Sequence, residues 1–446
     1  MSEPRRVPGA RDLAALVLAR VQKEKAFASA ALEAELGRAV QLDARDRALA
    51  TELVYGSLRV EPWLLERIAQ FAPRGLHSID ARVRAHLVVA AYQLFFTRVP
   101  AFAAVSEAVE AIRASRGPRM AAFANAVLRK VAEQAQKPGP EAREEAIVAS
   151  TPAWLREALE RALSAEGARA FLRCGTEPPP IALRVEQAPQ RDEWLARLHA
   201  AAPQATFEPG RISPRAILAR GAGKPQSLPG WSDGAWAVQE EGSQLAALAV
   251  GAREGERVLD ACAGRGNKTA ILARDVGASG SVDACDSSPS KLERLGEELV
   301  RLGLHAHATF AVDWSVGSGD VSGVYDRVLV DAPCTGVGTL RRRPEIGLRR
   351  EPTDLAAKTA TQLAIASRAA EHVRPGGALV YVVCSVLREE AEQVIEALAR
   401  ARPELEPAPF DSPAARALCA DATSFRLLPH VHGTDGYFVA NLRRRE

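Results

Sequence analysis

The stretch VLDACAGRGNKTAILA, residues Val258 to Ala273, decides the fold of this 446-residue chain. It reads as the end of an apolar strand, a tight turn through Gly264 and Gly266, and the start of a helix. Glycines in such a turn let backbone N–H groups approach a ligand, and the following helix points its positive end at that ligand. The pattern indicates a nucleotide-like cofactor on an α/β sheet.

Two better-known phosphate-binding loops do not fit this stretch. A Walker loop would require glycine at positions 262 and 267, which hold Cys262 and Asn267. A dinucleotide fingerprint has its third glycine where this chain has Thr269. An ordinary strand–turn–helix corner without a ligand therefore remains an alternative at this point.

Three later strands carry polar residues at their ends. Asp286 closes GSVDACD, about 20 residues past the glycine turn, where an acid meets ribose hydroxyls in such folds. The strand YDRVLVD leads into Asp331-Ala-Pro-Cys334, and GGALVYVVCS places Cys384 at the end of another strand, just before a predicted helix. Open α/β sheets bind ligands at this edge, so both cysteines are predicted there.

With these motifs the chain resembles the RNA cytosine-C5 methyltransferases that use S-adenosylmethionine, and within them the bacterial ribosomal RNA subgroup called RsmB, Sun or Fmu. DACAGRGNKT, DAPCTGVG followed by RRRPEI, and VCSVLREE carry the resemblance. The resemblance implies that Asp286 holds the cofactor ribose, that Asp313 lies by the adenine and that Asp331 lies between the cofactor amine and the target base. It also implies that one loop cradles the methionine part of the cofactor, namely Cys262, Ala263, Gly264, Arg265, Gly266, Asn267 and Lys268.

This chain departs from the family pattern at a few positions. The family usually reads AAPGGKT, so Arg265 replaces proline and Asn267 replaces glycine. Val383 stands for the threonine of TCS, and Glu186 stands for the asparagine of LRVN. We expect these changes to alter local loop geometry more than the chemistry.

The chemistry of cytosine C5 methylation explains the cysteines. A thiolate that adds to C6 makes C5 nucleophilic enough to take a methyl group, and cysteine both adds and leaves readily. Which thiol attacks is open from the residues alone, because DNA cytosine methyltransferases use the Pro-Cys thiol, here Cys334. The RNA family uses the cysteine before serine, and the VCS and RRRPEI contexts favour Cys384 as the nucleophile and Cys334 as the thiol that assists product release.

The order of segments predicts three parts. Residues 1–140 read as an all-α domain that resembles NusB, an RNA-binding antitermination factor, and QKPGPEAREE reads as a linker. Residues 141–235 read as a small α/β module that contacts RNA in the family. Residues 236–446 alternate strands and helices, which predicts a Rossmann-like methyltransferase domain with a mostly parallel sheet.

Composition bounds the remaining expectations. A net charge of +3 decides nothing. The arginines from Arg341 to Arg350 could be a solvated face, but their position directly after the predicted catalytic loop favours phosphate contacts, so we expect them to hold RNA together with the helical domain. The six cysteines form no C-x-x-C pair, so we expect no metal site. Scattered cysteines in a large chain suggest a reducing compartment, so we expect a cytoplasmic protein. No signal peptide or membrane span is expected. We expect 16S ribosomal RNA as the partner and leave the oligomeric state open, with a monomer favoured.

Two other functions compete with this interpretation. One is a non-catalytic RNA-binding or assembly factor with a degenerate methyltransferase domain, which the altered AGRGNKT loop would allow. The other is methylation of amino groups, which typically uses an Asn/Asp-Pro-Pro-Tyr type of loop in place of DAPC.

Overall fold

The computed structural model describes residues 9–135 and 140–446, and the chain divides into two compact units. The first comprises Met1–Glu157, Glu166–Glu177 and Leu340–Arg349, and the second comprises Ala158–Ala165, Pro178–Thr339 and Arg350–Glu446. The first part of the predicted linker lies outside the described residues. Its remainder is helical from Pro140 on, because proline fits the first turn of a helix, where its missing N–H is not needed.

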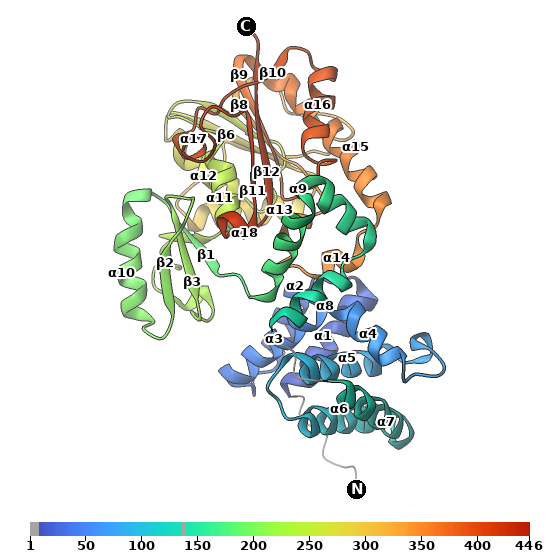
Figure 1. Cartoon of the computed structure of the whole chain (residues 1–446). Helices are drawn as coiled ribbons and strands as arrows, with labels where there is room; N and C mark the ends of the chain where they lie inside the picture. The colour runs from blue at the N-terminus through green and yellow to red at the C-terminus, as the bar shows by residue number, and fades with distance from the viewer. Residues whose placement is uncertain (1–8, 136–139) are drawn as a thin grey trace. The chain divides into compact units, whose positions relative to one another are not determined.

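The first unit is helical, as the sequence predicts (Figure 1). Its helices are α1 (Ala10–Glu24), α2 (Ala28–Arg38), α3 (Ala44–Arg59), α4 (Glu61–Ala69), α5 (Ala81–Phe96), α6 (Ala101–Arg116), α7 (Pro118–Gln134) and α8 (Pro140–Ser150). Side-chain caps begin two of them: Asp43 accepts from the amide of Asp46, and Asp80 accepts from the amides of Arg82 and Val83. Helix α5 is buried along nearly its whole length and forms the centre of the bundle.

A distant segment completes this helical unit. Leu340–Arg349, which includes α14 (Glu345–Arg349), belongs to it although the rest of its neighbourhood in sequence does not. The buried carboxylate of Glu345 accepts from the amide of Ala28 at 3.1 Å. The Arg349 guanidinium donates to the carbonyls of Val21, Lys25 and Ala26, so it satisfies carbonyls that the end of α1 leaves without helical partners.

The second unit contains a small antiparallel sheet of order β2-β3-β1-β4. Its strands are β1 (Ile181–Val185), β2 (Thr206–Pro209), β3 (Ala216–Arg220) and β4 (Trp236–Val238), with α10 (Arg191–Ala201) packed on it. Trp194, Leu198, Phe207 and Trp236 belong to its own hydrophobic core. In the sequence, PPPIALRVEQ (178–187) and RAILAR (215–220) read as strands and RDEWLARLHAA (191–201) reads as a helix, which agrees with β1, β3 and α10; the short β2 and β4 are not predicted. The residues before this sheet form the helix α9 (Ala153–Arg173), which is broken at Ser164 (φ 68°). The three-part division of the chain stays a prediction.

The large sheet has the order β10-β12-β9-β8-β5-β6-β7, with β11 paired to β12. Its strands are β5 (Arg257–Asp260), β6 (Ser281–Asp286), β7 (Ala308–Ala311), β8 (Tyr325–Asp331), β9 (Val373–Val383), β10 (Leu405–Pro407), β11 (Ser424–Leu427) and β12 (Tyr437–Arg444). Strands β5 to β9 run parallel, whereas β12 is antiparallel to β9, β10 and β11. The sheet is therefore mostly parallel, as predicted, with an antiparallel edge. The accompanying helices are α11 (Glu241–Leu248), α12 (Asn267–Val276), α13 (Pro289–Arg301), α15 (Pro352–Ala369), α16 (Glu392–Ala401), α17 (Pro413–Cys419) and α18 (Pro429–His432).

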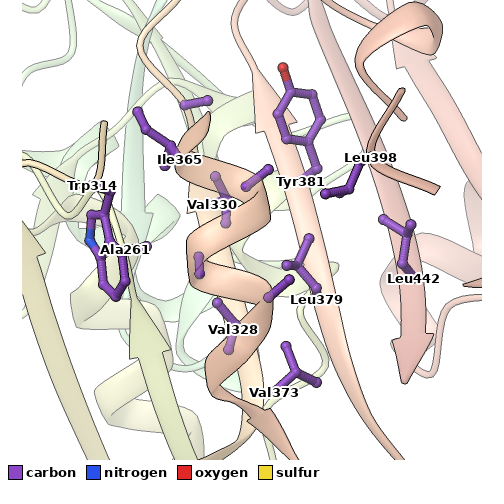
Figure 2. Packing of buried hydrophobic residues seen from close by; sticks show 14 of the residues in the cluster. Ala261, Trp314, Val328, Val330, Ile365, Val373, Leu379, Tyr381, Leu398 and Leu442 are labelled. Atoms are coloured by element: carbon purple, nitrogen blue, oxygen red, sulfur yellow. The ribbon is translucent and has the colours of Figure 1, made fainter. Parts of the chain in front are cut away.

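Both faces of this sheet are buried, which explains the continuous apolar runs in its strands. Alternate residues of neighbouring strands meet on one face, where Val330 lies opposite Tyr381 in the register and Ile365 of α15 covers them (Figure 2). The intervening residues, such as Val380 and Val382, pack on the other face. No helix in the described part of the chain is long and apolar enough to cross a membrane.

Strand order places a ligand site at one point of this sheet. From β5 the chain goes outward to β6 and β7, then returns to β8 on the other side of β5. Ligands of open α/β sheets bind at the carboxyl ends of strands where the order reverses in this way. Here those ends are Asp260 and Asp331.

Candidate active site

Two thiols meet at the carboxyl end of the sheet. Cys334 follows β8 and Cys384 follows β9, and their sulfur atoms lie 3.2 Å apart. Both cysteines are partly buried. The structure thus brings together the two residues whose strand-end positions predict a shared edge.

The environment favours a neutral Cys334. The hydrogen bond with Cys384, followed by burial, raises the pKa of the Cys334 thiol well above its ordinary value. A neutral Cys334 can donate its S–H to the sulfur of Cys384.

The residues after Cys384 differ from the prediction. The sequence predicts that a helix begins directly after this cysteine. In the structure α16 begins only at Glu392, after a turn through residues 385–391. The predicted helix start was wrong because residues 388–391 form a turn in which the Glu390 side chain is buried.

The T-G-V-G loop after Cys334 is attached to the second cysteine. The amide of Gly338 donates to the carbonyl of Cys384 at 3.0 Å, and the amide of Gly436 donates to the carbonyl of Gly338 at 2.7 Å. A Cβ atom on Gly338 would lie 2.0 Å from the Gly436 carbonyl oxygen and 2.8 Å from that of Cys384. Only glycine permits this approach of three backbone segments.

A charged pair lies beside the thiols. The ammonium of Lys268 donates to Oδ2 of Asp331 at 2.6 Å, and both residues are predicted site residues. Burial lowers the pKa of Lys268, but the Asp331 carboxylate outweighs burial and the net pKa is raised. Lys268 is therefore a cation at neutral pH.

The predicted cofactor loop turns as its glycines require. Gly264 has a φ of 60° and Gly266 a φ of 87°, a region that other residues rarely adopt. A Cβ atom on Gly266 would lie 2.8 Å from Leu295, whereas one on Gly264 would meet nothing within 4 Å. Cys262 and Ala263 begin the loop, and burial raises the pKa of Cys262 well above its ordinary value. Arg265 is exposed at the tip of the loop.

The two acids assigned to ribose and adenine have different surroundings. Asp286 is buried and accepts from the amide of Gly264 at 3.1 Å and from the ammonium of Lys291 at 3.1 Å. Asp313 is exposed and accepts from the Ser315 hydroxyl at 2.6 Å, which lowers the pKa of Asp313. The amide of Val312 bonds the carbonyl of Asp286, so the segments that carry both acids are adjacent.

Asp260 was not identified as a site residue from the sequence. It is fully buried at the end of β5, and its Oδ2 accepts from the Thr269 hydroxyl at 2.8 Å, while Oδ1 has no partner among the described residues. Burial raises the pKa of Asp260 to about 7. Its strand-end position, equivalent to that of Asp331, was the available signal.

Glu186, which stands where the family usually has asparagine, binds a buried arginine. Arg184 is fully buried on β1 and donates to the Asn267 carbonyl at 2.7 Å and to Glu186 at 2.7 Å. Glu186 also accepts from Arg274 of α12 at 3.2 Å. The carboxylate therefore neutralises a buried guanidinium that holds the backbone of the cofactor loop.

The residues of the loop fit S-adenosylmethionine. The open space beside Gly264 leaves room for a ligand against the backbone, and the unpartnered Oδ1 of Asp260 offers an acceptor to a cationic group such as the cofactor amine. The Asp286 carboxylate accepts from the Gly264 amide, and helix α12 begins three residues later at Asn267. An open cavity of about 950 Å³ elsewhere in the second unit is lined by none of the predicted site residues.

Comparison with known proteins agrees with this geometry. A family model described as 16S rRNA methyltransferase RsmB/F matches residues 247–443, and the NusB family model matches residues 8–133. The chain is 34% identical over 450 residues to ribosomal RNA small subunit methyltransferase B of Pseudomonas syringae pv. tomato, covering 96% of this chain and 95% of the relative. It is 36% identical over 471 residues to a putative methyltransferase of Mycobacterium tuberculosis, covering 99% and 98%.

A solved structure shares the fold of the whole chain. The crystal structure of PH0851 superposes with a TM-score of 0.81 at 24% identity and covers 100% of both chains. Because curated relatives more than 30% identical match nearly the full length, the chain belongs to the RsmB/F family of 16S ribosomal RNA methyltransferases, whose methyl donor is S-adenosylmethionine.

Proposed function

We propose that this protein methylates carbon 5 of a cytosine in 16S ribosomal RNA through a covalent adduct between Cys384 and C6 of the base. The distance of 3.2 Å between the sulfur atoms of Cys334 and Cys384 is the observation that carries the proposal. One thiol is needed to form the adduct and a second group beside it assists its breakdown. Two thiols in contact at the ligand-binding edge of the sheet supply both.

The raised pKa of Cys334 supports the division of roles. A neutral Cys334 can donate its S–H toward the Cys384 sulfur, so in this proposal it acts as the proton-bearing neighbour and not as the nucleophile. The thiolate is the nucleophilic form of cysteine. Cys384 is therefore the attacking residue in this proposal, and Cys334 remains protonated.

The reaction then follows from the chain's own groups. The Cys384 sulfur bonds to C6, and the electron density displaced from the C5–C6 double bond makes C5 nucleophilic. S-adenosylmethionine supplies an electrophilic methyl group on its sulfonium. C5 takes this methyl group, and the sulfonium electron pair leaves with S-adenosylhomocysteine. When a water molecule takes the C5 proton, the C5–H electrons restore the C5–C6 double bond and the Cys384–C6 bond breaks. The S–H of Cys334 stabilises the departing Cys384 thiolate.

The remaining site residues bind and orient. Pairing with Lys268 fixes the direction of the Asp331 carboxylate, which in this proposal lies between the cofactor amine and the target base. Asp286 lies against Gly264 and faces the ribose in this proposal, with Asp313 near the adenine. The base has to be single-stranded or turned out of a helix for C6 to be reached.

Two arginines of the Arg341–Arg350 segment bind backbone carbonyls of the protein itself. Arg349 is engaged with the carbonyls at the end of α1, and Arg350 donates to the Thr335 carbonyl at 3.1 Å. These two guanidiniums therefore support backbone in this proposal and do not bind phosphate. RNA contacts fall to other cations of the helical unit and of the small sheet, and affinity should decrease steeply with salt.

A denaturing gel of protein incubated with RNA and cofactor tests the proposal. Cys384→Ala should abolish both methylation and the covalent adduct, whereas Cys334→Ala should form the adduct and retain it because breakdown is slowed. The reverse pattern would make Cys334 the nucleophile. Full activity in both variants would rule out the covalent mechanism, whereas no methylation by the wild-type protein would favour the non-catalytic RNA-binding factor.

A further inference from the structure

Glu390 is a buried acid that the proposed chemistry does not use. Its side chain is fully buried, and Oε1 accepts from the Thr335 amide at 2.7 Å and from Nε2 of Gln362 at 3.0 Å. Its Oε2 accepts from the Thr335 hydroxyl. All three donors are uncharged. Burying a carboxylate costs free energy unless its oxygens accept hydrogen bonds. Thr335 and Gln362 supply these hydrogen bonds to Glu390.

These bonds fix the chain on both sides of Cys334. Thr335, which follows the cysteine, is bound to Glu390 through its amide and its hydroxyl. Pro333, which precedes the cysteine, has its carbonyl bound by the same Gln362 amide group at 3.1 Å. The cysteine is thus the middle residue of a turn whose two neighbours are both anchored.

Glu390 is itself tied to the strand that carries the other thiol. It lies six residues after Cys384, and its backbone carbonyl accepts from the hydroxyl of Tyr381 at 2.8 Å. Tyr381 is a fully buried residue of β9. Glu390 therefore links the turn after β8, through its side chain, to strand β9, through its backbone carbonyl, and the two sulfur atoms are held by these two segments.

The charge of Glu390 acts in the same sense as its hydrogen bonds. After the hydrogen bond with Cys384 and burial, the Glu390 carboxylate adds to the causes that raise the pKa of Cys334. A negative charge near this turn disfavours a second one on the Cys334 sulfur.

We infer that Glu390 is a positioning residue for Cys334, which holds the Pro333–Thr335 turn so that the Cys334 thiol stays against the Cys384 sulfur while the methylated base is released. The inference rests on the proposed covalent mechanism. Loss of Glu390 should leave the attack by Cys384 intact and slow only the breakdown of the adduct.

The test compares Glu390→Ala with Glu390→Gln. In Glu390→Ala the turn loses three hydrogen bonds, so adduct should accumulate at least about tenfold over wild type while turnover falls by a similar factor. Glu390→Gln can still accept from the Thr335 amide and donate to its hydroxyl, so it should retain most of the turnover. Glu389→Ala is the matched control. Glu389 is the adjacent residue, but its carboxylate accepts from Arg161 and does not contact the Pro333–Thr335 turn. It should form and release the adduct as wild type does.

The readouts separate positioning from general damage. Adduct formation in a single turnover and calorimetric binding of S-adenosylmethionine should change by less than about threefold in Glu390→Ala, since about 0.7 kcal/mol corresponds to that factor. Loss of adduct with cofactor binding retained would assign Glu390 to the attack step and overturn the inference. Wild-type turnover in Glu390→Ala would overturn it as well.

Two further variants keep the test decisive. Thr335→Val removes one of the three bonds without a large change in volume, and it should raise the adduct level in the same direction by a smaller factor. If Glu390→Ala does not fold, an unchanged adduct level in Thr335→Val refutes the inference. Cys334→Ala run beside them tests the mechanism itself: if it accumulates no adduct, the covalent proposal fails, whatever Glu390 does.

Discussion

The ammonium nitrogen of Lys268 lies 2.6 Å from Oδ2 of Asp331, although 63 residues separate them in the sequence. The pair joins the first helical turn after the glycine loop to the end of the central strand β8. It thereby fixes the cofactor loop relative to the residue that precedes the Pro-Cys turn.

Asp331→Asn should reduce methylation and also lower stability by about 2 kcal/mol, because the mostly buried Lys268 ammonium loses its anionic partner while Asp331 is partly exposed. A loss of about 2 kcal/mol in transition-state stabilisation would lower kcat/KM about thirtyfold. Methyl transfer from labelled cofactor measures this. Asp326→Asn changes the same residue type on the same strand, but Asp326 pairs with Arg374 away from the thiols, so this control should remain active. Equal activity of both variants would contradict a role for the pair.

Gly338→Ala should impair both stability and activity. The added Cβ would lie 2.0 Å from the Gly436 carbonyl oxygen, so the backbone has to move, at a cost of about 1–3 kcal/mol. Because Gly338 is bonded to the Cys384 carbonyl, the movement should separate the two thiols. Thermal unfolding and methylation rate measure the two effects. Gly296→Ala, in helix α13 with nothing within 4 Å of its Cβ, should instead stabilise by about 0.5–1 kcal/mol.

Asp260 should make stability depend on pH between about 4 and 7. Its carboxyl has a pKa of about 7 in the folded chain and about 3.9 in the unfolded chain, so its contribution is fully present below pH ~4. As pH rises to ~7, only the unfolded chain releases the proton, and unfolding becomes easier by up to about 4 kcal/mol. Asp260→Asn lacks this titration. In denaturant unfolding without cofactor, the free energy of unfolding of Asp260→Asn should rise relative to that of the wild type from pH ~4.5 to ~7. If the two free energies change in parallel with pH, the assigned pKa is wrong.

Arg349→Ala should affect stability more than RNA binding. The guanidinium donates to three carbonyls at the end of α1, and hydrogen bonds from a charged donor contribute about 1.5–3 kcal/mol each when buried, so a total near 2 kcal/mol is expected at this half-buried site. Arg119, which is exposed at the start of α7, is the matched control and should change stability by less than about 0.5 kcal/mol. The slope of RNA affinity against salt should stay unchanged in Arg349→Ala. If the magnitude of this salt slope falls by about one unit in Arg349→Ala, Arg349 does contact a phosphate.

Much of this architecture can be predicted from local patterns. Strands β5, β6, β8 and β9 are apolar runs that end in a polar residue or a cysteine, so both their existence and the shared edge of Cys334 and Cys384 follow from period and position. The helices of the first unit follow from their apolar spacing. Glycine turns and strand-end acids are local signals as well and indicate a nucleotide-like cofactor, whereas S-adenosylmethionine was expected from the resemblance to a family.

Other features depend on contacts that no local pattern records. Glu390 and Thr335 are 55 residues apart, and a Glu-Glu pair before a helix is typical of an exposed first turn, so its burial could not be predicted. The same reasoning misplaced the helix after Cys384. Asp260 was overlooked because a strand-end acid within a glycine motif is easily assigned to the loop that follows it.

The inclusion of Leu340–Arg349 in the helical unit has a consequence for biosynthesis. Helices α1 to α8 leave the ribosome long before this segment is translated, by roughly 10–40 s at ordinary rates of synthesis. During that interval the Ala28 amide and the carbonyls at the end of α1 lack their native partners Glu345 and Arg349. The amino-terminal part of this nascent chain is therefore an incomplete folding unit that closes late, and a chain released before Arg349 would carry helices without the segment that completes them.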